Sequence, residues 1–134
     1  MKTESNDTEL GVIFTLLEIG EYLAEVATNQ TNPEIKKVLY EKTATQLDVI
    51  ENRIQLLMEE LAGEAPPPNL AERMQEINTC YIEAASLFIA TLDFYREFME
   101  TCNFTLINEA RIAIDSARIK LNRAYEKTNA LYFD

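Results

Sequence analysis

Uncharged and mostly apolar residues recur at alternating spacings of four and three along one long segment of the chain. The positions are Leu70, Met74, Ile77, Tyr81, Ala84, Phe88, Thr91, Tyr95, Phe98 and Cys102. A row of this length predicts a helix of roughly 30 residues, well above the mean of about 11–12 for globular proteins. Because an isolated helix is only marginally stable in water, this row must pack against other helices.

Three further segments carry rows of the same kind. One contains Tyr40, Thr43, Leu47, Ile50, Ile54, Leu57 and Leu61; another contains Ile107, Ala110, Ile114, Ala117, Leu121, Ala124, Thr128 and Leu131. The alternation of large and small residues in the second row should let a neighbouring helix approach closely. In the first helical segment we expect Val12, Leu16, Ile19, Leu23 and Val26 to face the core, with Gly20, Ala24 and Ala27 beside them.

Capping and turn residues divide the chain into four predicted helices, at residues 8–28, 33–62, 70–101 and 105–131. Asp7 and Asn32 are expected N-caps of the first two helices, and Asn103 or Thr105 of the last. Short connections favour antiparallel neighbours. The sequence therefore predicts one domain over residues 1–134, an all-α, antiparallel, up-down-up-down four-helix bundle.

The net charge of −11 restricts the partners of the chain. Nucleic-acid backbones and anionic membranes attract basic surfaces, so we expect neither as a partner. The most apolar stretch, residues 10–27, contains Glu18, Glu21 and Glu25, which argues against a membrane span. The polar residues 1–7 show no apolar signal core, and a cytoplasmic location is the default expectation.

Opposite charges also predict which helices are neighbours. Between residues 8 and 29 the first helix has four acidic residues and no basic one, whereas the last helix holds five of the twelve basic residues: Arg111, Arg118, Lys120, Arg123 and Lys127. In an up-down bundle these two helices are adjacent, so acidic and basic side chains should face each other.

The absence of histidine excludes much catalytic chemistry. Di-iron sites of the Glu-x-x-His type and Ser-His or Cys-His nucleophiles cannot form, and no glycine-rich phosphate loop is present. We therefore expect no cofactor. Cys80 and Cys102 lie about 33 Å apart on one predicted helix, so they cannot bridge within it. Two reduced, mostly buried thiols are expected, with an intermolecular disulfide through Cys102 as the alternative.

Carboxylate chemistry with Mg²⁺ or Mn²⁺ remains open, since these ions prefer oxygen ligands. The string from Leu17 to Glu25 is similar to the first acidic motif of the all-α NTP pyrophosphatases of the MazG type. That family pairs Glu-Glu-x-x-Glu with a later Glu-x-x-Asp, which would fall here at residues 45–48. The resemblance implies Glu18, Glu21 and Asp48 as metal ligands. Leu17 and Thr45 stand where the family has glutamates.

The predicted core row of the first helix argues against such a metal site. If Leu16 and Ile19 face the core, Glu18, Glu21 and Glu25 lie on the outer side of that helix. Ligands for a catalytic metal should instead converge in a cavity.

Two helices carry more apolar residues than a bundle seam needs. The third helix adds Ile82, Ala85, Leu87, Ile89, Leu92, Phe94 and Met99 to its row. The last helix adds Ile112 and Ile119, one heptad apart and opposite its core row. These residues predict a second contact surface, for which a second copy of the chain is the simplest partner.

The sequence thus favours a non-enzymatic interaction protein, such as an adaptor, a chaperone-like protein or a small regulatory bundle. It would act through helix surfaces, as a homodimer formed at Ile112 and Ile119, and a different protein partner is also open. The alternatives are a metal-dependent nucleotide pyrophosphatase centred on Glu18, Glu21 and Asp48, and a carrier of a small apolar ligand in the bundle core.

Overall fold

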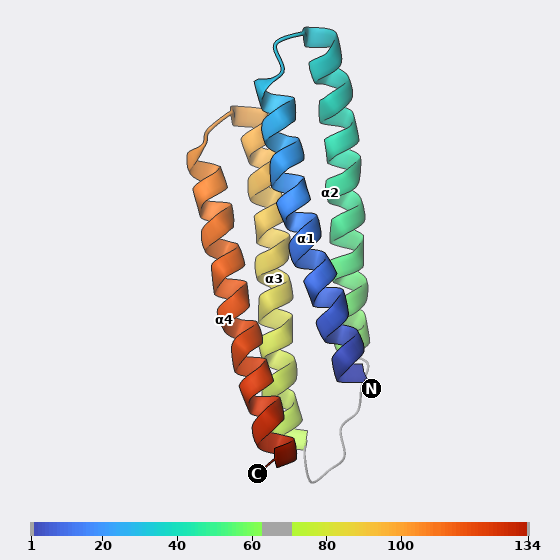
Figure 1. Ribbon diagram of the computed structural model, residues 1–134, viewed down its shortest axis with the longest axis vertical. Helices are drawn as coiled ribbons and strands as arrows, with labels where there is room; N and C mark the ends of the chain where they lie inside the picture. Colours follow the sequence, from blue (N-terminus) through green and yellow to red (C-terminus); the bar gives the residue numbers. More distant parts are fainter. Residues whose placement is uncertain (1, 63–70, 134) are drawn as a thin grey trace.

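The protein is a bundle of four α-helices. The computed structural model describes residues 2–62 and 71–133, with side-chain surroundings described for 10–60 and 71–130. The helices are α1 (Lys2–Asn29), α2 (Pro33–Ala62), α3 (Ala71–Thr101) and α4 (Thr105–Phe133). Consecutive helices run in opposite directions, as Figure 1 shows. The predicted all-α four-helix bundle is confirmed.

The start of α1 differs from the prediction. The helix begins at Lys2, so Asp7 lies inside it and is not its N-cap. No glycine or proline stands between Lys2 and Leu10, and nothing in the local sequence stops the helix from extending backwards.

The predicted caps of α2 and α4 are present. The side-chain oxygen of Asn32 accepts hydrogen bonds from the backbone N–H groups of Glu34 and Ile35, at 3.0 and 3.3 Å. At the start of α4, Asn103 accepts from the N–H of Thr105 at 3.1 Å. These bonds satisfy N–H groups that the first helical turn leaves without partners.

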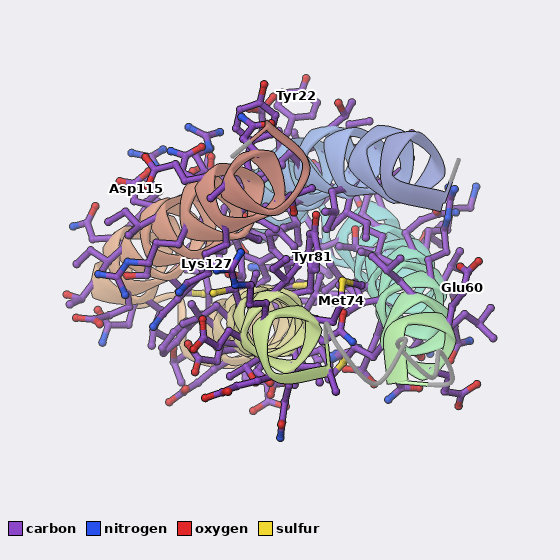
Figure 2. The ribbon with its side chains drawn as sticks, turned by 90° about the horizontal axis from the view of Figure 1, so that it is seen from below. Tyr22, Glu60, Met74, Tyr81, Asp115 and Lys127 are labelled. Carbon is purple, nitrogen blue, oxygen red and sulfur yellow. The ribbon has the colours of Figure 1, made fainter. Side chains whose placement is uncertain are left out.

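Helix α3 is the central helix of the bundle, because it packs against α1, α2 and α4. Seven residues of its predicted row are buried: Ile77, Tyr81, Ala84, Phe88, Thr91, Tyr95 and Phe98. Leu70 lies outside the described residues, and Cys102 is exposed just beyond the helix end. Figure 2, an end view, shows Tyr81 among the interior side chains and Tyr22 on the outside.

The additional apolar residues of α3 serve the interior of the bundle. Ala85, Leu92 and Met99 are buried, and Leu87, Ile89 and Phe94 pack against the core. A helix with neighbours on three sides needs a wider apolar surface than one with two. The prediction that this excess marks a contact surface is therefore wrong for α3, where among these residues Ile82 is the one that is exposed.

The core rows of α2 and α4 follow the prediction closely. In α2 the buried members are Thr43, Leu47, Ile50, Ile54 and Leu57; in α4 they are Ile107, Ala110, Ala117 and Ala124, with Ile114 and Leu121 partly buried. Leu61 and Leu131 have side chains outside the described set. The alanines of α4 face α3, and these two helices form the most extensive contact in the bundle.

The predicted core row of α1 is wrong by one position. The buried residues are Leu10, Ile13, Leu17, Gly20, Ala24 and Ala27, whereas Ile19 is 46% exposed. The reason is close approach at the small residues. A Cβ atom on Gly20 would lie 3.2 Å from the Cδ2 atom of Leu47 and 3.5 Å from the ring of Tyr95. A side chain at Gly20 would require Leu47 to move by a few tenths of an ångström.

Helices α1 and α4 are not among the helix pairs that pack closely in the bundle. The close helix pairs are α3–α4, α1–α2, α2–α3 and α1–α3, and Figure 1 shows α1 slanting across α2 and α3. The backbones of α1 and α4 therefore lie farther apart than those of the close pairs. In the described part of the chain, no helix combines the length and the apolar character needed to cross a membrane.

Candidate functional site

The outward face of α4 carries the two isoleucines that the sequence singles out. Ile112 is 59% exposed and Ile119 is 54% exposed. Glu109 and Arg123 are two heptads apart, so they lie close to one line along α4, to one side of the line through Ile112 and Ile119. Along the helix, Glu109 comes before the isoleucines and Arg123 comes after them. The face thus combines an apolar centre with one acidic and one basic end.

Exposed apolar side chains also occur on α1 and α2. They are Ile19, Tyr22 and Val26 on α1, and Ile35, Val38, Val49 and Leu56 on α2. Single exposed apolar residues are common on protein surfaces. Exposure alone therefore does not distinguish the isoleucine pair of α4. Val49 and Leu56 on α2 are an exposed apolar pair with the same heptad spacing.

Asp48, one of the candidate metal ligands, is held by an arginine between α2 and α3. Arg96 donates to Asp48 at 2.9 Å, to Glu51 at 2.7 Å and to Asp93 at 3.0 Å. Partial burial opposes the charge of Arg96, but the hydrogen bond and charge of Glu51 outweigh it, so the pKa of Arg96 is raised. This cluster joins α2 to α3.

Glu21 lies on the opposite side of the bundle, between α1 and α4. Arg111 donates from Nε to one carboxylate oxygen of Glu21 at 2.9 Å and from Nη2 to the other at 3.4 Å. The expectation that Glu21 faces outward is wrong, because the true core row turns α1 by one residue, or about 100°. The predicted acid–base facing of α1 and α4 is confirmed at this pair. Lys120 and Lys127 instead pair with Glu83 and Glu76 of α3.

The three candidate metal ligands are not brought together. Glu21 bonds to Arg111 and Asp48 bonds to Arg96, on different seams of the bundle, while Glu18 is exposed beside Glu21. Among the described residues, no three His, Cys, Asp or Glu side chains are grouped so that they could hold a metal ion.

A cavity of about 250 Å³ lies where α1 and α4 stand apart, with α3 beneath. Its lining residues are Phe14, Glu18 and Glu21 from α1, Tyr95 from α3, and Arg111, Ile114, Asp115 and Arg118 from α4. The guanidinium of Arg118 lies 5.0 Å from the ring centre of Phe14, a cation–π contact across the cavity mouth. The wall thus combines apolar surface with charges of both signs.

Tyr95 is the residue that sequence reasoning missed. We expected it only as core, and its residue is fully buried, but its hydroxyl has no hydrogen-bond partner among the described residues. Burial raises the pKa of this hydroxyl well above its ordinary value. The charge of Glu21 adds to that effect, and the charge of Arg111 opposes it. The available signal was a hydroxyl-bearing side chain in a core row, which Tyr95 shares with Tyr81 and Thr91.

A second cavity, of about 390 Å³, lies between α2 and α3. Its lining residues are Tyr40, Glu41, Ala44, Leu47, Arg96, Met99 and Glu100. The surface is mostly apolar, and the one guanidinium beside it, that of Arg96, is already bonded to three carboxylates. This cavity therefore combines a mainly apolar wall with the carboxylates of Glu41 and Glu100.

The two cysteines are both free, but only Cys80 is buried as expected. Cys102 is exposed and has a positive φ of 58°, just after α3 ends. Its N–H donates to the carbonyl of Phe98 at 2.7 Å, which closes the last turn of the helix.

Comparisons of the chain with protein-family models, with curated proteins and with solved structures give no significant match. No family match therefore supports the short similarity to the MazG-type pyrophosphatases.

Proposed function

We propose that this protein is a non-enzymatic helical-bundle interaction protein of the cytoplasm, acting as an adaptor, chaperone-like or small regulatory protein, and that it self-associates through the outer face of α4. The observation that carries the proposal is the exposure of Ile112 and Ile119, one heptad apart on the side of α4 that faces away from the core. Burying them against apolar surface would be favourable.

An antiparallel two-fold pairing of α4 satisfies both the apolar and the charged residues of this face. Centred between the isoleucines, it places Ile112 of one copy against Ile119 of the other. The same pairing sets Glu109 of each copy near Arg123 of the other, because both lie on one side of the isoleucines at similar distances from the axis. Charge complementarity of this kind selects the direction of helix pairing.

The proposed interface is small. Two isoleucines per copy fall short of the roughly 1,200 Å² that stable complexes bury. We therefore expect a dimer whose population rises with protein concentration. The metal-dependent enzyme and the apolar carrier remain sequence-based predictions.

The test is the solution mass by light scattering over a range of protein concentrations. The native chain should form dimers, and Ile112→Lys/Ile119→Lys should remain a folded monomer at every concentration. Val49→Lys/Leu56→Lys is the matched control, since it places the same charges at the same spacing on α2, and it should still dimerise. A monomeric native chain, or dimers lost only in the α2 variant, would refute the α4 interface.

A charge exchange tests the direction of pairing. Glu109→Arg and Arg123→Glu should each weaken association, because each places like charges opposite one another. The double variant should restore it, since the pairs are then reversed but again complementary. Failure of the double variant to recover would exclude the antiparallel arrangement.

A further inference from the structure

The cavity between α1, α3 and α4 has a polar group at its base that the fold does not use. The residue of Tyr95 is fully buried, and its hydroxyl lacks a hydrogen-bond partner among the described residues. Its ring edge lies 3.5 Å from the position that a Cβ atom of Gly20 would occupy. The ring of Tyr95 thus lies directly against α1 at Gly20.

The cavity lining carries three acidic side chains and two basic ones, which are Glu18, Glu21, Asp115, Arg111 and Arg118. Arg111 is committed to Glu21 by two hydrogen bonds, at 2.9 and 3.4 Å. Arg118 lies over the ring of Phe14. Within the described part of the chain, the carboxylate of Glu18 has no ion-pair partner, and it lines the same cavity.

The surroundings of Tyr95 also oppose negative charge. Burial raises the pKa of its hydroxyl, and the charges of Glu21, Glu18 and Glu25 act in the same direction against the smaller opposing effect of Arg111. The burial part of this effect opposes a charge of either sign, but the carboxylate charges oppose an anion and favour a cation.

We propose that this cavity binds a small organic cation, a protonated primary amine with a short apolar tail. The ammonium group would donate hydrogen bonds to the carboxylate of Glu18 and to the hydroxyl oxygen of Tyr95. The tail would lie against Phe14 and Ile114. A volume of about 250 Å³ suits a molecule of this size and is too small for a nucleotide. Neither Ile112 nor Ile119 lines the cavity, and this proposal does not rest on the proposed self-association.

Three probes of similar shape and different charge test this proposal: 2-phenylethylamine, 2-phenylethanol and phenylacetate. Isothermal titration calorimetry at neutral pH should show binding of the amine. We expect the alcohol to bind roughly tenfold more weakly, since it lacks a charge-assisted hydrogen bond, and phenylacetate more weakly still. Equal binding of the amine and phenylacetate, or no binding of the amine at millimolar concentration, would overturn the proposal.

Variants then place the binding at this cavity. Glu18→Gln should weaken the amine by roughly tenfold and Tyr95→Phe by roughly fivefold, the worth of a charged and a neutral hydrogen bond. Glu97→Gln and Tyr125→Phe are the matched controls, because both residues are exposed and neither lines the cavity. Far-UV circular dichroism checks that each variant folds. Amine affinity that is unchanged in both cavity variants would mean that the amine binds elsewhere, which rejects the site.

Discussion

Tyr95→Phe should make the free protein more stable, the reverse of the usual result of a core substitution. The change removes one oxygen atom and keeps the ring that packs against Gly20 and Leu47. In the folded protein this hydroxyl has lost its hydration and has no partner among the described residues. Its removal therefore relieves a desolvation penalty and takes only one atom out of the packing.

The expected gain is about 1 kcal/mol, the lower end of the roughly 1–3 kcal/mol that an unsatisfied buried polar group costs. At about 2.1 cal/mol/K per residue, the entropy of unfolding of a 134-residue chain is roughly 0.28 kcal/mol/K. The gain then corresponds to a rise in Tm of about 3–4 °C.

Urea unfolding followed by circular dichroism at 222 nm measures the effect. The midpoint should rise for Tyr95→Phe while the slope of free energy against urea stays constant. Tyr125→Phe, at a residue that is 61% exposed, should stay within about 0.5 kcal/mol of the native chain. A loss of stability of about 1 kcal/mol or more in Tyr95→Phe would show that the hydroxyl makes a favourable bond, and the reasoning about the cavity would be wrong.

Three further predictions follow from the same structure. Above pH 10 Tyr95 ionises in the unfolded chain but stays neutral in the folded chain, because its folded pKa is raised. The stability of the native chain should therefore fall by about 1.4 kcal/mol per pH unit relative to that of Tyr95→Phe. Urea unfolding at alkaline pH measures this, and parallel curves of stability against pH for the two chains would contradict it. Glu51→Gln should lower the free energy of unfolding in urea by about 1–2 kcal/mol, since this partly buried carboxylate bonds to Arg96 at 2.7 Å. Asp48→Asn should lower it by under about 0.5 kcal/mol, because Asp48 is largely exposed. Cys102→Gly should stabilise the protein by up to about 1 kcal/mol and raise its Tm, because glycine adopts a positive φ without strain. A Tm below that of Cys102→Ala would refute this prediction.

The sequence predicted the fold because its strongest signals are local and periodic. The rows of α2 and α3 consist mainly of large apolar residues, and the row of α4 alternates such residues with alanine. Each row keeps its spacing over a whole helix, which makes the buried face predictable. The caps Asn32 and Asn103 act within one turn, so they too can be predicted from sequence.

The error in α1 explains why the cavity was missed. Its true row runs through Gly20, Ala24 and Ala27, small residues whose burial reflects close helix contact rather than hydrophobicity. Such contact depends on the partner helix, which the local sequence does not specify. Taking the larger residues Ile19 and Leu23 as the core row turned Glu21 away from α4 and left Tyr95 as an ordinary core residue.

The central position of α3 has a consequence for how the molecule opens. Because α3 packs on all three other helices and α1 packs closely on only two, α1 can separate from α4 while the α3–α4 contact stays intact. Amide hydrogen exchange should therefore be slowest in the middle of α3 and faster along α1. Such local opening would widen the entrance above Tyr95 without global unfolding, so exchange of a ligand would be set by the motion of a single helix.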